Sequence, residues 1–154
     1  MEVLLEKTVH LTTKHDRTNV ILPFTVPHDF ARLEISIAYS PKYITDPQDV
    51  KNAVMDCYKR YLLPEDVPET VDPAAFKLSN LLTLSLDCNG RYVGAAHRQA
   101  PLQFHVISKE KSSRGFWKCA VEKGEWRAVI NVHSLAAGHV DYEIQIVGKE
   151  DGEE

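Results

Sequence analysis

The sequence predicts a mainly β protein, a two-sheet antiparallel β-sandwich of the jelly-roll type with one inserted α-helix. Between residues 80 and 148, short segments alternate apolar and polar residues and are separated by turn signals. The first 40 residues alternate in the same way, and only one later stretch has helical spacing. Seven to nine strands with one helical insertion favour a sandwich over a barrel or a βαβ fold.

The clearest strands lie near the C-terminus. In the segment 125–133, one face carries the apolar residues Trp126, Ala128, Ile130 and Val132. A segment from Val140 to Ile146 repeats this pattern, with polar residues on the opposite face. The short Ala136-Ala137-Gly138 connection predicts that these two strands pair as neighbours in a sheet with one solvated face.

Three strands are expected in the N-terminal part of the chain: Val3 to Thr13, Val20 to Val26 and Ala31 to Ser40. Proline cannot donate a ladder hydrogen bond, so Pro23 marks the second of them as an edge strand or a bulge. In the third, one face is apolar and carries Leu33, Ile35, Ile37 and Tyr39.

The remaining strands are expected from about Leu78 onward. Leu82, Leu84 and Leu86 share one face, and Asp87-Cys88-Asn89-Gly90 forms a tight turn. The chain then continues through the segment 91–98 to a strand at Leu102 to Ser108.

One helix is expected over about residues 47–63. Asp46 can cap it, Pro47 suits its first position, and Pro64 closes it. Six apolar or weakly polar residues form a stripe at helical spacing: Val50, Val54, Cys57, Tyr58, Tyr61 and Leu62. The helix should therefore lie against the sheets. The segment 63–76, rich in proline and acidic residues, is expected to be a solvated connection or a mobile flap.

The 154 residues predict a single domain over residues 1–148 and an acidic tail, 149–154, that frays. No apolar run approaches the roughly 20 residues that span a bilayer, and the N-terminus does not resemble a signal peptide. Three widely spaced cysteines suggest reduced thiols, and together these observations favour a cytoplasmic protein. A net charge of -4 makes nucleic acid and anionic membranes unlikely partners.

Five strings in the sequence are similar to those of a known family: Asn80 to Leu86, Asn89-Gly90, Gly94 to Arg98, Lys123 to Arg127 and Asp141 to Ile144. They resemble the N-terminal β-sandwich domain that precedes the catalytic domain in PHP-type metallohydrolases of the CehA/McbA group. The strands of residues 24–39, the Tyr39-Ser40-Pro41 link and the helical insertion fit the same layout, so the resemblance covers most of the chain.

The resemblance implies an accessory domain. In that family, a following domain holds the catalytic metals with His-x-His and Asp ligands, and this chain contains no His-x-His pair. It would act alone or apart from its enzyme. The family tends to have a Gly/Pro-rich loop before the Gly-x-Trp strand, whereas this chain has Ser112 to Cys119, so properties of that loop are expected to differ.

Four residues are candidates for ligand binding: Trp117, Arg114, His97 and Arg98. An exposed tryptophan can stack on a sugar ring while polar neighbours hold the hydroxyls. Trp126 shares a face with apolar residues and is expected in the core, whereas Phe116 and Trp117 point in opposite directions, so that one is exposed. His97 and Arg98 follow small residues and could orient an anion or a hydroxyl; alternatively, Arg98 ties its loop to the sheet.

Metal and thiol chemistry receive little support. His105, His133 and His139 fall on predicted polar faces, but no histidine has a second one at ligand spacing, so no metal or other cofactor is expected. The three cysteines also give no catalytic residue: Cys57 is expected in the core, Cys88 in an exposed turn beside an aspartate, and Cys119 has only Lys118 to lower its pKa.

The sequence therefore predicts a non-catalytic binding or assembly module that recognises a glycan or another polar ligand. One alternative is a protein-interaction domain in which a sheet face or edge packs on a second copy or on a PHP-type hydrolase. Another is a small metal-dependent hydrolase that gathers histidines from several strands.

Overall fold

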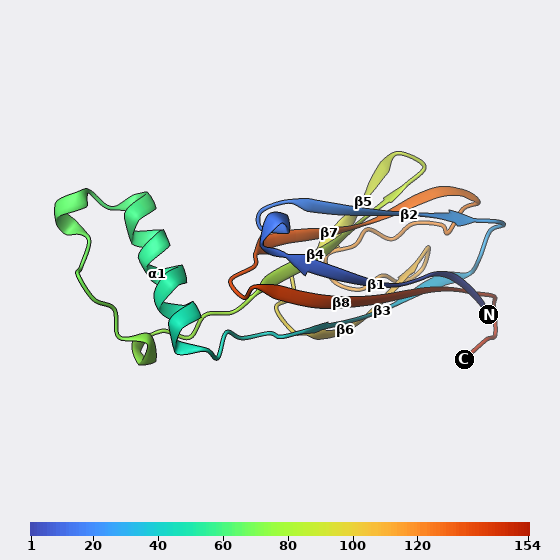
Figure 1. Ribbon diagram of the computed structural model, residues 1–154. Coiled ribbons are helices and arrows are strands. Elements are labelled where there is room, and N and C mark those ends of the chain that lie inside the picture. Colours follow the sequence, from blue (N-terminus) through green and yellow to red (C-terminus); the bar gives the residue numbers. More distant parts are fainter.

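The computed structural model describes all 154 residues and contains two antiparallel sheets of four strands each (Figure 1). The first sheet has the order β1 (Glu2–Thr12), β8 (His139–Lys149), β3 (Arg32–Ser40) and β6 (Leu102–Ser108). The second has the order β2 (Asn19–Val26), β7 (Gly124–Ser134), β4 (Leu81–Cys88) and β5 (Arg91–Ala96). The mainly β sandwich is confirmed, and β4 begins at Leu81 instead of about Leu78.

The connections follow a jelly roll. Successive strands alternate between the two sheets, except that β4 and β5 form a hairpin within the second sheet. The predicted pairing of β7 with β8 is wrong: β7 pairs with β2 and β4, and β8 pairs with β1 and β3. The Ala136-Ala137-Gly138 link thus crosses from one sheet to the other. The alternation of apolar residues predicts which face of each strand is buried. Because both sheets bury their apolar faces in the same interior, the alternation does not predict which strands pair with each other.

The interior between the sheets is built from the predicted inward faces. Trp126 is fully buried there, as expected, and its Nε1 donates a hydrogen bond of 2.9 Å to the Glu122 carbonyl oxygen. The tight turn after β4 is also confirmed, with positive φ at Asn89 (48°) and Gly90 (79°), as a two-residue hairpin with this backbone twist requires. Pro23 lies in β2, an edge strand of the second sheet, in agreement with its chemistry.

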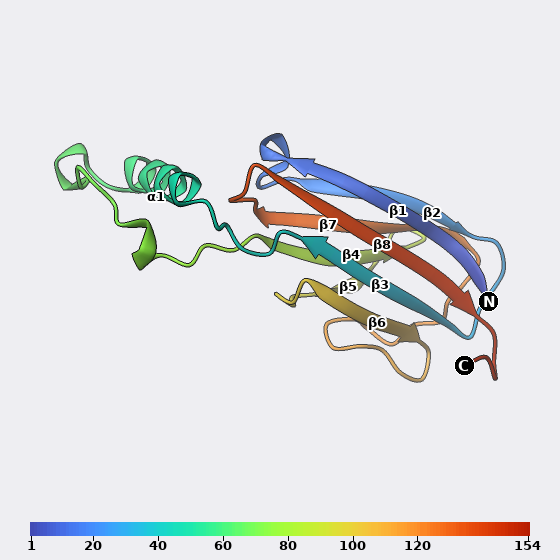
Figure 2. The ribbon, with the colours of Figure 1, turned by 60° about the horizontal axis from the view of Figure 1, so that its bottom comes forward.

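The helix does not lie against the sheets, which corrects the sequence prediction. α1 (Pro47–Tyr61) belongs to an arm, residues 41–80, that leaves one end of the sandwich (Figures 1 and 2). Its buried residues Val50 and Val54 pack against Val71 of the same arm, in a small cluster separate from the main core. The segment after the helix therefore covers part of the apolar stripe, while Cys57 and the end of the stripe remain exposed.

The base of the arm is anchored to the sandwich by Asn80, whose side chain is fully buried. Asn80 Oδ1 accepts hydrogen bonds from the backbone N–H groups of Ala136 (2.8 Å) and Ala137 (3.1 Å), and its Nδ2 donates to the Pro41 carbonyl (2.8 Å). Lys42 Nζ adds bonds to Tyr39 Oη (3.1 Å) and to the Asn80 carbonyl (3.0 Å). One buried amide thus joins both ends of the arm to the β7–β8 link.

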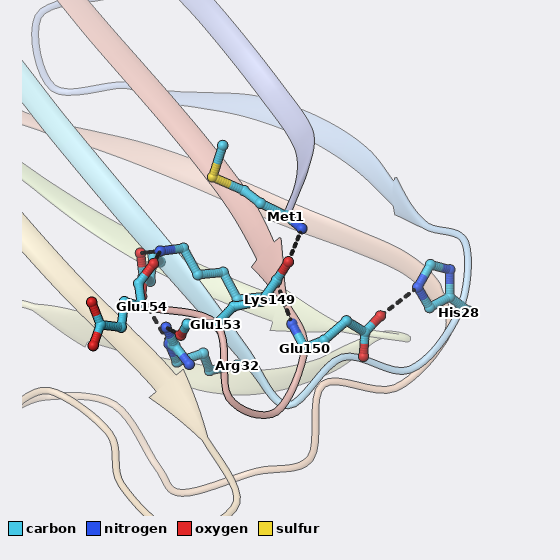
Figure 3. A network of polar contacts seen from close by, with 8 residues as sticks. Met1, His28, Arg32, Lys149, Glu150, Glu153 and Glu154 are labelled. Atoms are coloured by element: carbon cyan, nitrogen blue, oxygen red, sulfur yellow. Dashed lines mark hydrogen bonds and ion pairs between the residues drawn. The ribbon is translucent and has the colours of Figure 1, made fainter.

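The acidic tail, expected to fray, folds back on the sandwich (Figure 3). Glu153 pairs with the Met1 amino group, and its carbonyl accepts a hydrogen bond from Arg32. Arg32 and Lys149 also contact Glu34, at 2.8 and 3.2 Å. Partial burial acts to raise the pKa of Glu34, but the hydrogen bonds and charges of these two cations outweigh it and hold the pKa below its usual range. The two chain ends therefore meet at one end of the molecule.

No helix of the protein combines the length and the apolar character that crossing a bilayer requires.

Candidate functional site

The loop between β6 and β7 places Trp117 on the surface, as predicted. Its side chain is 70% exposed, whereas Phe116 is buried. Residues 115–117 lie along β5, because Trp117 N–H donates to the Val93 carbonyl (2.8 Å) and Ala95 N–H donates to the Gly115 carbonyl (3.0 Å). This close approach requires glycine at position 94, where a Cβ would lie 2.3 Å from the Gly115 oxygen. The segment acts as a short extra strand at the edge of the second sheet.

The side chains of the four predicted ligand-binding residues are not in contact with one another. Trp117 lies opposite Val93, and His97 follows four residues farther along the chain, roughly 13 Å away at the usual rise of a strand. No hydrogen bond, ion pair or ring contact joins the exposed side chains of Trp117, Arg114, His97 and Arg98 to one another. The His97 ring instead lies 6.1 Å from the ring of His133, which bonds to Thr83 Oγ1 at 2.7 Å.

His105 is not on a polar face, which corrects another expectation. Its Cα pairs with that of Ile35, and both side chains are fully buried between the sheets. The edge of Phe116 covers the ring at a centroid distance of 5.4 Å. His105 therefore belongs to the interior, at the side that the loop of residues 112–119 closes.

The hydrogen bonds around His105 determine which of its ring nitrogens carries the proton. Gln103 Nε2 donates to the carbonyls of Arg98 (3.1 Å) and Ala100 (2.8 Å), so its Oε1 faces His105 Nε2 at 2.8 Å and accepts the proton there. The buried Nδ1 has no partner. Burial, together with the positive charge of Arg98, lowers the pKa of His105 from 6.5 to about 4, so this imidazole is neutral at neutral pH.

The other histidines and the cysteines do not converge into a metal centre. Nowhere in the protein do three or more His, Cys, Asp or Glu side chains form a group suited to a metal ion, so the metal-dependent hydrolase hypothesis lacks a ligand set. Two expectations for cysteines are wrong: Cys57 is exposed on the arm, and Cys88 is buried in the core. Burial raises the pKa of the Cys88 thiol and outweighs the opposing effect of Arg91.

The outer face of the first sheet carries a groove that the sequence analysis did not identify. Its volume is about 840 Å³, and it crosses all four strands. Small side chains on β3, Ser36 and Ala38, leave space above the middle of the sheet. Two apolar side chains of β6 border it: Phe104 is 54% exposed and Leu102 is 74% exposed.

The side of the groove away from β6 is polar. Ser36 pairs with Phe104 on one side and with Gln145 on the other, and Gln145 pairs with Glu6 of β1. The next row along the strands adds Glu143, with Thr8 beyond it on β1. One exposed aromatic ring therefore stands in the same row as a hydroxyl, an amide and a carboxylate.

A smaller cleft of about 480 Å³ separates the polar face of α1 from the end of the sandwich. Charged residues of both signs line it, among them Asp16, Arg17, Asp49, Asp56 and Arg60. It contains no aromatic ring, so it lacks the combination found in the groove.

The groove could have been suspected from β6, where Leu102 and Phe104 alternate with His105 and Ile107 and both faces of the strand are therefore partly apolar. Its depth depends on which strands lie beside β6, and that arrangement was not predicted. Comparison of the sequence with protein-family patterns and with curated proteins gives no match.

Proposed function

We propose that this protein is a non-catalytic binding module that holds a polyhydroxylated ligand, such as a glycan, in the groove on the outer face of its first sheet. The row from Phe104 through Ser36 and Gln145 to Glu6 is the observation that supports this function most directly. A sugar ring can stack on the aromatic face, while its hydroxyl groups donate to the carboxylate and exchange hydrogen bonds with the amide.

The charges of the groove favour neutral or amine-bearing glycans over acidic ones. Glu6 and Glu143 lie on the outer face. Lys7 also lines the groove, but it pairs with the buried Ile144 and therefore starts from the inner face of β1, so the carboxylates dominate. A uronic acid would bring a third carboxylate close to these two, and like charges in a partly desolvated site oppose binding.

The relation to PHP-type hydrolases remains part of this proposal. Three unpaired thiols support a reducing, cytoplasmic setting in which such a hydrolase could be the partner. Co-purification of the tagged protein with a metallohydrolase is the expected result, and its absence would leave an independent binder.

The groove is tested by titrating ¹⁵N-labelled protein with neutral, amine-bearing and acidic oligosaccharides. Amide shifts should cluster on the four strands of the first sheet, β1, β3, β6 and β8. The variants Phe104→Ala and Glu6→Gln should each weaken binding about tenfold, as the loss of roughly 1.4 kcal/mol of contact energy implies. Trp117→Ala is the matched control and should leave the affinity unchanged.

Two results would contradict the proposal that the groove binds a glycan. Amide shifts confined to residues near Trp117 and His97 would move the site to the second sheet. The absence of shifts across the whole panel, at millimolar ligand, would remove the support for a glycan ligand. Circular dichroism of each variant confirms that the fold is retained.

A further inference from the structure

The tip of the arm exposes three consecutive large apolar residues. Tyr61 is 68% exposed, Leu62 40% and Leu63 62%. They lie where α1 ends, on the part of the molecule that stands away from the sandwich (Figures 1 and 2). Three consecutive exposed apolar side chains at such a point are a starting point for a search for a partner surface.

Charged residues flank this run in an ordered way. Lys59 and Arg60 precede it, Glu65 and Asp66 follow it, and all four are exposed. None of the four side chains makes an ion pair or a hydrogen bond within the chain. Along the chain, the tip therefore has two cations before an apolar centre and two anions after it, and none of these side chains has an ion-pair partner, although Arg60 also lines the cleft between α1 and the sandwich.

We propose that the arm tip is a self-association surface, at which two copies of this chain meet about a twofold axis close to Leu62. A twofold contact brings each surface against its own copy in reverse order. Because Lys59 and Glu65 lie three residues before and after Leu62, the basic side of one tip then faces the acidic side of the other. The tip is thus complementary to itself in charge, and its apolar centre is covered by an identical centre.

A second copy fits this surface better than a partner of one charge would. The chain carries a net charge of -4, so two copies repel each other in general, whereas the two positive and two negative charges of the tip cancel. These seven tip residues are fewer than the roughly 20 to 30 per partner of a typical stable interface, so the contact is expected to be weak and dependent on concentration.

Reversed charges test the proposal in the full-length protein. Lys59→Glu with Arg60→Glu makes every charge of the tip negative, and Glu65→Lys with Asp66→Lys makes every charge positive. Sedimentation equilibrium should show a dimer for the natural protein at high concentration, and at least tenfold weaker self-association for each variant. An equimolar mixture of the two variants should form a heterodimer tighter than the natural dimer. The control Lys51→Glu with Lys109→Glu lowers the net charge as much as Lys59→Glu with Arg60→Glu does, but away from the tip, and should dimerise as the natural protein does.

A cross-link provides the second measurement. In a Cys57→Ser background, Leu62→Cys should form a disulfide-linked dimer under mild oxidation, whereas Leu102→Cys, also exposed, should not. Three outcomes would overturn the proposal: a natural protein that is monomeric at all concentrations, dimers that persist in both charge variants, or a mixture of the two variants that fails to associate. None of these outcomes bears on ligand binding in the groove.

Discussion

His105 is the one titratable side chain that the sandwich encloses between its sheets without satisfying all of its polar atoms. Its Nδ1 lacks a donor, and an unmet hydrogen bond of this kind costs about 1–3 kcal/mol. The remainder of its surroundings compensates, because Gln103 accepts the Nε2 proton and Phe116 packs on the ring. The imidazole therefore stays in the core only in its neutral form.

This histidine should make folding stability depend on pH. Its pKa is 6.5 in an exposed chain and about 4 in the folded protein, so between these values the unfolded state binds the proton more readily. The contribution of His105 to the free energy of unfolding is therefore fully present above pH 6.5. It is lost progressively as the pH falls toward 4, by about 3 kcal/mol over the whole interval.

His105→Leu should remove this contribution. We expect urea unfolding of the variant to lose about 2–3 kcal/mol less stability between pH 7 and pH 4 than the natural protein loses. Ile107→Val, an inward-facing neighbour on β6, serves as control and should shift stability by the same amount at every pH. Equal pH slopes for the natural protein and His105→Leu would contradict the assignment.

The misplacement of His105 shows where residue-level prediction failed. His105 and Ile107 have the same parity along β6, and Ile107 is fully buried. Strict alternation would have placed the histidine inside, but its polarity favoured the surface. The buried hydrogen bond that His105 Nε2 donates to Gln103 offsets this polarity, and it cannot be predicted from spacing. For Trp126, polarity and parity agreed, and the prediction was right.

At the scale of elements, each edge strand of the sandwich carries a feature that opposes pairing with another chain. Pro23 interrupts donation from β2, and the loop of residues 112–119 bonds to both β5 and β6. On β1, the charged residue Lys7 occupies a position on the inner face of the strand. A bulge also interrupts the register near Val3. These features disfavour assembly through sheet edges.

Lys7 is expected to act as the main barrier on β1. Lys7→Val would extend the inner apolar row of this long edge strand, and we expect the variant to aggregate at lower concentration and to bind thioflavin T on prolonged incubation. Lys14→Val, in the 3₁₀ turn Thr13–His15 beyond the strand, is the matched loss of charge and should stay soluble. Equal solubility of the two variants would show that the bulge alone protects this edge.

The helix shows what periodicity cannot supply. Its start was predicted correctly, because Asp46 caps the N-H groups of Gln48 and Asp49 and Pro47 takes the first position. The helix ends at Tyr61, before the predicted residue 63. The prediction that it packs against the sheets was wrong, because it packs against the segment that follows it. An apolar stripe requires a cover, but it does not say whether a sheet or the following loop provides it.

At the scale of the whole molecule, the alternating pattern was enough to predict the sandwich, its jelly-roll type and a single inserted helix. It could not predict the groove or the arm, because both depend on which elements become neighbours. The groove needs the small residues of β3 beside Phe104, and the arm follows from Asn80 closing the base of the insertion. The resemblance to hydrolase accessory domains remains a prediction.

The arm should be dispensable for the sandwich. Tyr43 and Ser79 form a β-bridge at its base, so residues 44–78 can be replaced by a short Gly-Ser turn. We expect the shortened protein to keep the near-ultraviolet circular dichroism of buried Trp126 and a stability within about 2 kcal/mol of the natural protein, because the entropy of loop closure changes slowly with length. Loss of cooperative unfolding would show that the arm supports the core.

The meeting of Met1 with Glu153 gives the molecule two distinct poles, with both chain ends at one and the arm at the other. Any protein carried on either terminus would stand beyond the pole opposite the arm. It would leave the tip of the arm unobstructed. The length of the sandwich would then set the distance between the attached protein and the tip.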